Sequence, residues 1–293
     1  MRLRLVVLSF IALLTGLTGH SLAAGDEKIR LIQYNVKGSE NGWVTGSPNI
    51  TYKLNLISDV IMNNSVDFIT LEEADKKDGD VPSPLLSDEL KVQGVSGWKT
   101  ISSSCNKDVV QISYSSQWTL VAQLGSGGHA AGFGWAGCNR GDGRPYDIGL
   151  FKNKTTNRSI LIIATHLPHC HAMVSKCADG WSVGKFNEDK AKILSLSRNS
   201  DVVVIITGDM NEIGESATND ELGAVFTLKN LKKSKYEITT CCKHDGWRYH
   251  FDHVATTGPN APTVDVIKAP KEAERYFAEK EHRMIYSEVL LSR

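Results

Sequence analysis

Polar residues that can bind a metal ion or transfer a proton follow several apolar stretches of the sequence. The run VVVIIT, residues 202–207, is followed by Gly-Asp-Met-Asn, which contains Asp209 and Asn211. A continuous apolar run is typical of a strand buried on both faces, and the glycine and polar residues mark its end. A simple turn, in which both side chains accept backbone hydrogen bonds, would explain this segment by itself. The other strand ends decide between the two interpretations.

The same arrangement recurs elsewhere in the chain. IRLIQY is followed by Asn35, VDFITL by Glu72 and Glu73, SILIIAT by His166, FDHV contains Asp252, and Glu281 and His282 precede MIYSEV. Carboxylate and carboxamide oxygens are the ligands that Mg²⁺ and Ca²⁺ prefer, and imidazoles transfer protons near neutral pH. This recurrence favours a site that holds a divalent cation and moves protons around a phosphate.

A framework of strands and helices must bring these residues together. Apolar patterns predict strands at 29–36, 66–75, 109–116, 146–153, 159–169, 202–211, 249–257 and 284–292. Helical spacing of apolar residues predicts helices at 52–64 and 186–199. No repeat and no Pro- or Ser-rich linker divides the chain. The pattern therefore predicts a single domain with a two-layered sheet core flanked by helices.

Length and composition are those of a folded domain. The chain has 293 residues, of which 41% are hydrophobic, enough to bury a sizeable core. Its 33 basic and 33 acidic residues give a formal net charge of zero, so overall charge does not indicate a polyanionic partner. A local basic cleft remains compatible with this balance.

The N-terminal segment has the layout of a secretory signal. Two arginines precede an apolar stretch from Leu5 to Leu14, and the segment ends with Ala23 and Ala24. The stretch is shorter than the roughly 20 residues that span a bilayer, which disfavours a membrane anchor. We expect residues 1–24 to be removed, residues 25–293 to form the mature domain, and that domain to be secreted without a membrane span.

Export changes the meaning of the cysteines. Six are present: Cys105, Cys138, Cys170, Cys177, Cys241 and Cys242. An even number in an oxidising compartment predicts disulfide bonds in place of a metal site. Cys170 and Cys177 are spaced to close a short loop, whereas a bond between the adjacent Cys241 and Cys242 would be strained. The pairing stays open.

The order of the motifs resembles that of the endonuclease/exonuclease/phosphatase superfamily. This superfamily includes DNase I, abasic-site endonucleases, the nuclease subunit of cytolethal distending toxins and neutral sphingomyelinases. The shared order is a first strand ending in Asn, a Gln-Glu or Asn-Glu pair, Thr-His, Gly-Asp-x-Asn, a late Asp and a C-terminal Asp-His, and it covers nearly the whole mature chain. The resemblance implies an α+β fold, a four-layered α/β-β/α sandwich of two packed mixed sheets.

The resemblance also assigns roles to individual residues. Glu73 matches the metal-binding Glu, Glu72 stands at the usual Gln, and Asn35 matches the Asn of the metal shell. His166 matches an imidazole near the scissile phosphate, Asp209 and Asn211 match the pair that orients the attacking water and holds a phosphate oxygen, and Asp252 matches the carboxylate that orients the last catalytic histidine, His282. A carboxylate beside one ring nitrogen fixes the tautomer and favours the imidazolium.

The chain departs from the superfamily pattern at its C-terminal motif. The usual Ser-Asp-His-x-Pro is replaced by Lys-Glu-His, which puts Glu281 at the metal-binding Asp, and no proline follows. Glutamate is longer by one methylene, so the ligand geometry differs. This departure motivates one alternative function, a non-catalytic binding protein that keeps the fold. An exposed histidine without a catalytic role is the alternative for His282.

A glycine-rich segment contains a further candidate. In GCNRGDGRPYDIG, Arg144 resembles a phosphate-contacting arginine of DNase-like proteins and would bind a phosphodiester through charge-assisted hydrogen bonds. A plain loop is the alternative. His129, His169 and His171 are interpreted as loop residues, because no fourth remote ligand accompanies them.

Together these features predict a secreted phosphodiesterase that depends on Mg²⁺, with Ca²⁺ or Mn²⁺ as alternatives. A DNase I-like endonuclease is favoured, and DNA is the expected partner. A sphingomyelinase-like or inositol-phosphate hydrolase is the enzymatic alternative, since the same core supports all of them. A monomer is expected, and delivery subunits stay compatible with the sequence.

Overall fold

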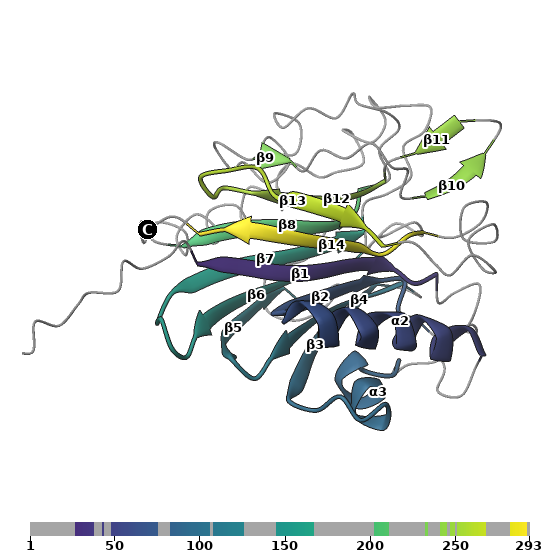
Figure 1. Cartoon of the computed structure of the whole chain (residues 1–293), viewed down its shortest axis with the longest axis horizontal. Helices are drawn as coiled ribbons and strands as arrows, with labels where there is room; N and C mark the ends of the chain where they lie inside the picture. The colour runs from purple at the N-terminus through teal and green to yellow at the C-terminus, as the bar shows by residue number, and fades with distance from the viewer. Residues whose placement is uncertain are drawn as a thin grey trace, which may run out of the picture.

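Strands with apolar inward faces build two mixed sheets that pack against each other (Figure 1). The computed structural model describes residues 27–37, 43, 48–75, 83–105, 108–125, 145–166, 202–210, 232–233, 241–244, 247–249, 251–267 and 282–291. The predicted signal segment and the predicted helix at 186–199 lie outside these residues. No helix among them is long and apolar enough to cross a membrane.

The first sheet has six strands around one parallel pair. Its spatial order is β13 (Thr263–Val266), β14 (Ile285–Leu290), β1 (Lys28–Asn35), β2 (Phe68–Glu72), β4 (Asp108–Ser115) and β3 (Trp98–Cys105). Strands β1 and β2 are parallel, and the other neighbours are antiparallel. The parallel pair places the carboxyl ends of β1 and β2 at the same edge.

The second sheet repeats this plan. Its order is β5 (Trp118–Gly125), β6 (Tyr146–Asn153), β7 (Ser159–His166), β8 (Val203–Asp209), β12 (Asp252–Thr256) and β9 (Lys232–Lys233). Strands β7 and β8 are parallel and are buried on both faces, which explains their continuous apolar sequences. Strands β10 (Cys241–His244) and β11 (Trp247–Tyr249) form a separate two-stranded sheet.

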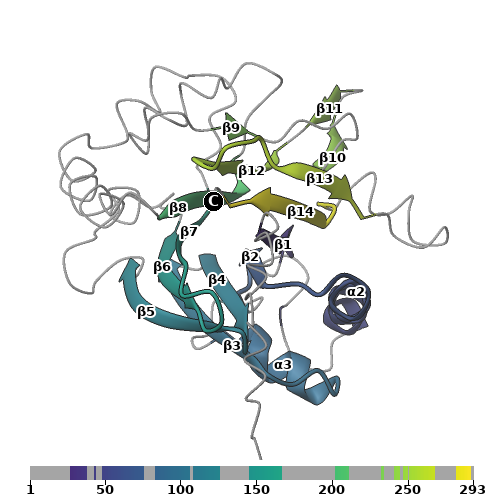
Figure 2. The same ribbon diagram turned by 60° about the vertical axis from the view of Figure 1, so that its left-hand side comes forward.

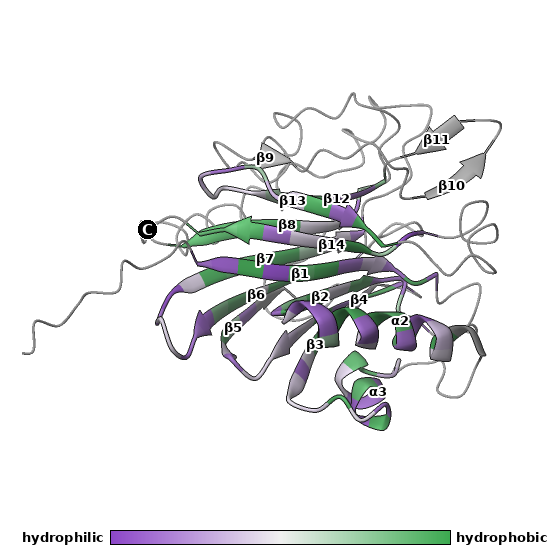
Figure 3. Cartoon of the chain, viewed as in Figure 1, coloured by the Kyte–Doolittle hydropathy of each residue, from purple (hydrophilic) through white to green (hydrophobic). Residues whose placement is uncertain are grey.

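Helices α2 (Pro48–Asn64) and α3 (Leu86–Val92) cover the face of the first sheet that is turned away from the second (Figure 2). Helix α2 carries hydrophobic and hydrophilic bands side by side (Figure 3), and Ile50, Leu54 and Ile57 are buried against the sheet. The helix ends at Asn64, and Ser65 takes the left-handed conformation that commonly terminates helices, with φ of +50°.

Residues from both sheets form the core between them. Phe68 on β2 contacts Trp118 on β5 and Phe151 on β6, with ring centroids 4.9 Å and 5.0 Å apart. The indole N–H of Trp118 donates a 3.0 Å hydrogen bond to Asp67. Burying an aromatic side chain of this size contributes about 1.5–3 kcal/mol. This cluster fixes the spacing of the sheets at one end of the sandwich.

The inward faces of the strands change from apolar to polar toward the other end. Alternate residues of a strand lie on the same face. The residues that face the other sheet are Ile29, Leu31, Gln33 and Asn35 on β1, Phe68, Thr70 and Glu72 on β2, Ile160, Ile162, Ala164 and His166 on β7, and Val203, Ile205, Thr207 and Asp209 on β8. All of these residues are buried. One end of the sandwich is therefore a hydrophobic core, and the other is a buried polar cluster.

The predicted fold class is confirmed by the two packed mixed sheets. The predicted strands match β1, β2, β4, β6, β7, β8, β12 and β14, and the helix predicted at 52–64 matches α2. Strands β3, β5, β9, β10, β11 and β13 and helix α3 were not predicted. The single mature domain over 25–293 stays a prediction. The side chains of the six cysteines lie outside the described structure, so the disulfides stay predictions too.

Candidate active site

The polar end of the sandwich collects residues from both sheets. Strands β1, β2, β7 and β8 finish there, while the antiparallel strands β4 and β12 begin there. The predicted site residues that the structure brings together are Asn35, Glu73, His166, Asp209, Asp252 and His282. Asn211, Arg144 and Glu281, together with His129, His169 and His171, lie outside the described residues.

Asp209 is the centre of this cluster. Its Oδ2 accepts a 2.8 Å hydrogen bond from Nδ2 of Asn35. The same oxygen lies 3.4 Å from Nε2 of His166 and 3.5 Å from Nε2 of His282. Asp209 is 1% exposed. A single carboxylate oxygen therefore faces one carboxamide and two imidazoles.

Gly208 allows strands β7 and β8 to approach closely beside Asp209. Its φ is +147°, and a Cβ at this position would lie 1.8 Å from the carbonyl oxygen of Thr165. Thr165 and Gly208 are partners in the parallel ladder, and the next pair is His166 with Asp209. The glycine of the Gly-Asp motif thus brings the imidazole and the carboxylate side by side.

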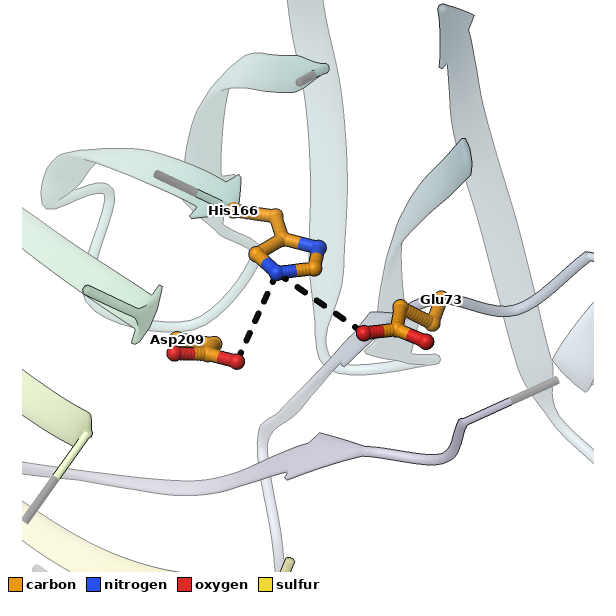
Figure 4. A group of neighbouring side chains, drawn as sticks. All are labelled: Glu73, His166 and Asp209. Carbon is orange, nitrogen blue, oxygen red and sulfur yellow. Dashed lines mark ion pairs between the residues drawn. The ribbon is translucent and has the colours of Figure 1, made fainter. Parts of the chain in front are cut away.

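His166 is held by a carboxylate on the other sheet. Its Nδ1 lies 2.8 Å from Oδ2 of Asp108, the first residue of β4, and the imidazole is buried. This contact directs Nε2 toward Asp209 and toward Oε1 of Glu73, which is 3.8 Å away (Figure 4). Asp108 was not among the predicted site residues. Its signal in the sequence is a polar residue at the start of an apolar strand, the pattern that also marks Asp252.

His282 and Asp252 form a second imidazole–carboxylate pair. Nδ1 of His282 lies 2.8 Å from Oδ2 of Asp252, and both residues are buried. Burial alone would lower the pKa of His282, but the negative charges of Asp252 and Asp209 outweigh it and raise that pKa to about 9. Burial also raises the pKa of Asp252, and the positive charge of His282 opposes this effect. These neighbouring charges therefore favour the imidazolium form of His282.

Glu73 reaches the site through an unusual backbone conformation. The residue has φ of +51°, in the left-handed region that non-glycine residues seldom adopt. A regular strand would point Glu73 to the face opposite Glu72. The left-handed turn instead lets Oε1 of Glu73 accept a 3.1 Å hydrogen bond from Asn35 and approach His166. Strain of this kind concentrates at functional sites.

Asn35 connects carboxylates of the two sheets. Its amide nitrogen donates to Glu73 at 3.1 Å and to Asp209 at 2.8 Å. Its Oδ1 accepts a 3.0 Å hydrogen bond from the backbone N–H of Lys37, which fixes the orientation of the amide. In this orientation Asn35 presents its nitrogen, and not its oxygen, to the centre of the site.

Gln33, two residues before Asn35 on the same face of β1, makes a similar connection between the sheets. Its Nε2 donates to Oε2 of Glu72 at 2.7 Å and to Oδ1 of Asp252 at 2.9 Å. Burial and the nearby charge of Asp252 raise the pKa of Glu72 well above its usual range, although the hydrogen bond from Gln33 opposes them. Gln33 was not predicted as a site residue. Its signal is its place on the same strand face as Asn35.

Two groups of side chains have the spacing of cation ligands. One contains Glu73, His166 and Asp209, and the other contains Asp209, Asp252 and His282. In each group the ligand atoms lie within 4.8 Å of one another. The first group fits a divalent cation better for two reasons. The positive charge of His282 opposes a cation in the second group. The side chain of Glu73 is 14% exposed, so solvent reaches the first group. Hard oxygen ligands favour Mg²⁺, Mn²⁺ or Ca²⁺.

The geometry provides the groups for acid–base chemistry beside an anion. Each imidazole has its Nδ1 fixed by a carboxylate and its Nε2 turned toward Asp209. A fixed tautomer and a positive charge allow an imidazole to donate a proton or stabilise a developing negative charge. A cation at Glu73 would offset the carboxylates and admit an anionic group.

Solved structures with the same fold include several endonuclease/exonuclease/phosphatase proteins. One such protein from Bacteroides thetaiotaomicron superposes with a TM-score of 0.58 at 16% identity, covering 91% of this chain and 99% of that one. A truncated TDP2 from Caenorhabditis elegans gives 0.59 at 14% identity, with 90% and 98% covered. A mannosyl-6-phosphatase from B. thetaiotaomicron gives 0.58 at 16%, with 90% and 100% covered.

No protein-family model matches the sequence, and no curated protein sequence matches it either. The structural likeness nevertheless extends over about nine-tenths of the chain. It agrees with the two packed mixed sheets and confirms the fold that the order of the sequence motifs predicted. The chain therefore has the DNase I-like fold of the endonuclease/exonuclease/phosphatase proteins.

Proposed function

We propose that the protein is a secreted phosphoric-ester hydrolase that depends on a divalent cation and cleaves phosphodiester bonds, with DNA as the favoured substrate. The observation that carries this proposal is the convergence of two carboxylate-held imidazoles on Oδ2 of Asp209, beside Glu73. This set combines a place for a cation with two proton donors. Phosphoryl transfer needs such positioning and charge stabilisation more than covalent chemistry by the protein.

Each residue of the site has a separate role in the proposed hydrolysis. Glu73, with Asp209, would hold the cation, and the cation would act as a Lewis acid that polarises a phosphate oxygen. Asp209, together with Asn211, orients the attacking water. His282, as an imidazolium, stabilises the charge that develops on the phosphate. His166, held by Asp108, donates a proton to the leaving oxygen.

Residues outside the described structure complete the proposal. Arg144 would contact the phosphodiester backbone, Glu281 would assist Glu73 at the cation, and removal of residues 1–24 would release a secreted, monomeric mature protein. The first residues of the exported protein, read by N-terminal sequencing, test the cleavage after Ala24. An intact N-terminus on the exported protein would contradict it.

DNA is favoured over other phosphoesters by the Arg144 segment and by one structural neighbour. TDP2 from Danio rerio, which superposes with a TM-score of 0.56 at 16% identity, was solved with a single-stranded DNA product. The mannosyl-6-phosphatase neighbour supports a second candidate, a phosphatase acting on a sugar phosphate. Sphingomyelin and inositol phosphates remain alternatives on the same fold, as does a non-catalytic binding protein.

A parallel substrate test separates these functions. The purified mature protein with Mg²⁺ is offered supercoiled plasmid, sphingomyelin, inositol phosphates and mannose 6-phosphate. We expect nicking of the plasmid, weaker binding at higher salt because phosphate contacts release counterions, and slower cleavage by Arg144→Ala at all sequences. Intact plasmid beside release of phosphocholine or phosphate would overturn the nuclease. Inactivity on every substrate would favour the binding protein.

A further inference from the structure

We infer that Gln33 is a positioning residue for His282, acting through Asp252 and anchored by Glu72. The inference rests on the proposed function, because it assigns Gln33 to the same catalytic machinery. Gln33 lies on β1 in the first sheet, whereas Asp252 begins β12 in the second. Its side chain therefore connects the sheets directly beneath the site.

The hydrogen bonds of Gln33 define one orientation of its amide. Both N–H groups of Nε2 are used, one by Oε2 of Glu72 at 2.7 Å and the other by Oδ1 of Asp252 at 2.9 Å. Its Oε1 is buried, with no hydrogen-bond partner among the described residues. Rotation of the amide by 180° would bring this oxygen against two carboxyl groups. The orientation is therefore set by Glu72 and Asp252 together.

The contact with Asp252 determines what that carboxylate offers to His282. Oδ1 of Asp252 accepts from Gln33, and Oδ2 faces Nδ1 of His282 at 2.8 Å. With Oδ1 held, the plane of the carboxylate is fixed, and so is the direction of the imidazole. Nε2 of His282 then points at Asp209, 3.5 Å away. A small rotation of the Asp252 carboxylate would turn Nε2 of His282 away from Asp209.

Asn35 provides an internal parallel. It lies two residues after Gln33 on the same face of β1 and also donates twice, to Glu73 from the end of β2 and to Asp209 of the second sheet. Gln33 donates to the preceding glutamate of β2 and to Asp252. The two carboxamides thus bridge the sheets in successive rungs, one holding Asp209 and the other holding the partner of His282.

Gln33→Met tests the inference, because methionine fills a similar volume without a donor. The first measurement is the NMR signal of the Nδ1 proton of His282 in ¹⁵N-histidine-labelled protein, assigned with His282→Gln. We expect this signal to shift or broaden in Gln33→Met. We also expect kcat to fall about 10- to 100-fold on the phosphoester that the protein cleaves, with KM nearly unchanged, as for other residues that orient a catalytic group.

Two further variants separate positioning from general loss of packing. Thr70→Val removes an inward hydroxyl on β2 beside Gln33. This hydroxyl contacts Thr207 and the carbonyl oxygen of Ile32, and not Asp252 or His282, so its loss should leave the signal in place. Glu72→Leu should shift or broaden the His282 signal, because it removes the acceptor for Gln33. Glu72→Gln should keep the wild-type signal, because a glutamine oxygen can still accept the hydrogen bond from Gln33. If Gln33→Met does not fold, Gln33→Asn replaces it, since the shorter amide cannot reach both carboxyl groups.

The outcomes separate this inference from the proposed function. A His282 signal and a kcat in Gln33→Met equal to those of Thr70→Val would overturn the positioning role while leaving the hydrolase intact. A wild-type protein that cleaves no phosphoester would overturn the proposed function, and the NMR comparison would still decide whether Gln33 holds Asp252 and His282 in place.

Discussion

His166 and His282 direct their Nε2 atoms at the same atom, Oδ2 of Asp209, from 3.4 Å and 3.5 Å. They come from different places, since His166 ends β7 and His282 precedes β14 of the other sheet. Each is anchored through Nδ1 by its own carboxylate. A phosphate beside Asp209 would therefore meet two oriented imidazoles.

Replacing either imidazole should stop catalysis without unfolding the protein. We expect His166→Ala and His282→Ala each to lower kcat by at least about a hundredfold, the scale on which acid–base or charge-stabilising groups act. Circular dichroism and thermal unfolding establish that the fold is kept. A folded His282→Ala variant with the wild-type rate would show that another residue serves at this position.

Asp108 should act only through His166. Asp108→Asn removes the carboxylate that faces Nδ1 of His166, so we expect kcat to fall about 10- to 100-fold. Because both changes disable one unit, the double variant Asp108→Asn, His166→Ala should be no slower than His166→Ala alone. Multiplied losses in the double variant would assign Asp108 an independent role.

Removal of the divalent cation should abolish turnover. EDTA should inactivate the protein, Mg²⁺ should restore it, and Glu73→Ala should lose both activity and calorimetric Mg²⁺ binding. Glu288→Gln is the matched control, because this carboxylate pairs with Lys28 and Arg30 at the opposite end of β1. Full turnover by metal-stripped protein, or by Glu73→Ala, would remove the cation from the mechanism.

A buried carboxyl outside the site should make stability depend on pH. Burial raises the pKa of Asp147 to about 7, although hydrogen bonds from Gln123 and Ser103 oppose this shift. Between about pH 4 and pH 7 the folded state keeps a proton that the unfolded state has lost. The contribution of this group to the free energy of unfolding is therefore largest below about pH 4. It falls as the pH rises toward 7, by at most about 1.4 kcal/mol per pH unit.

Asp147→Asn should remove this dependence. Urea unfolding from pH 4 to pH 8 should show the variant gaining stability relative to wild type as pH rises to 7, and no further change above it. Parallel curves for the two proteins across this range would contradict the assignment.

Gly208→Ala should be strongly destabilising. The added methyl group would lie 1.8 Å from the carbonyl oxygen of Thr165, so the two parallel strands would have to separate. Gly94→Ala is the control, because Gly94 also has a positive φ, of +82°, but no atom beyond its two chain neighbours lies within 4 Å of its Cβ position. We expect Gly94→Ala to cost about 1 kcal/mol of stability and Gly208→Ala several times more in urea unfolding. Equal losses of stability in the two variants would show that the positive φ, and not the contact with Thr165, causes the effect.

The sequence predicted the interior of each sheet and missed its edges. The predicted strands are those with two neighbours, whereas β13 and β3 are the edges of the first sheet and β5 and β9 those of the second. An interior strand needs apolar residues on its buried faces, which gives a readable pattern. Edge strand β3, with its run of three serines, has one neighbour and carries no such pattern. Helix α3 spans only seven residues, too few for a clear helical period.

Site residues were predictable where they form part of a motif. Asp209, His166 and Asp252 stand at strand ends in a known order, but Asp108 and Gln33 have significance only through contacts across the sandwich. Glu73 is an intermediate case. Its type and place in the sequence indicated a ligand, but only its left-handed backbone explains how both adjacent glutamates face the site.

The carboxyl groups gathered at the polar end of the sandwich, those of Glu72, Glu73, Asp108, Asp209 and Asp252, work against the stability of the fold. Buried like charges repel one another and lose hydration, so each ionised group there opposes folding unless an imidazole or a cation compensates it. Amide substitutions of the carboxyl groups there that no imidazole compensates should then yield proteins that are less active but harder to unfold, a compromise between stability and activity that is common in enzymes. The hydrophobic half, centred on Phe68, offsets this deficit.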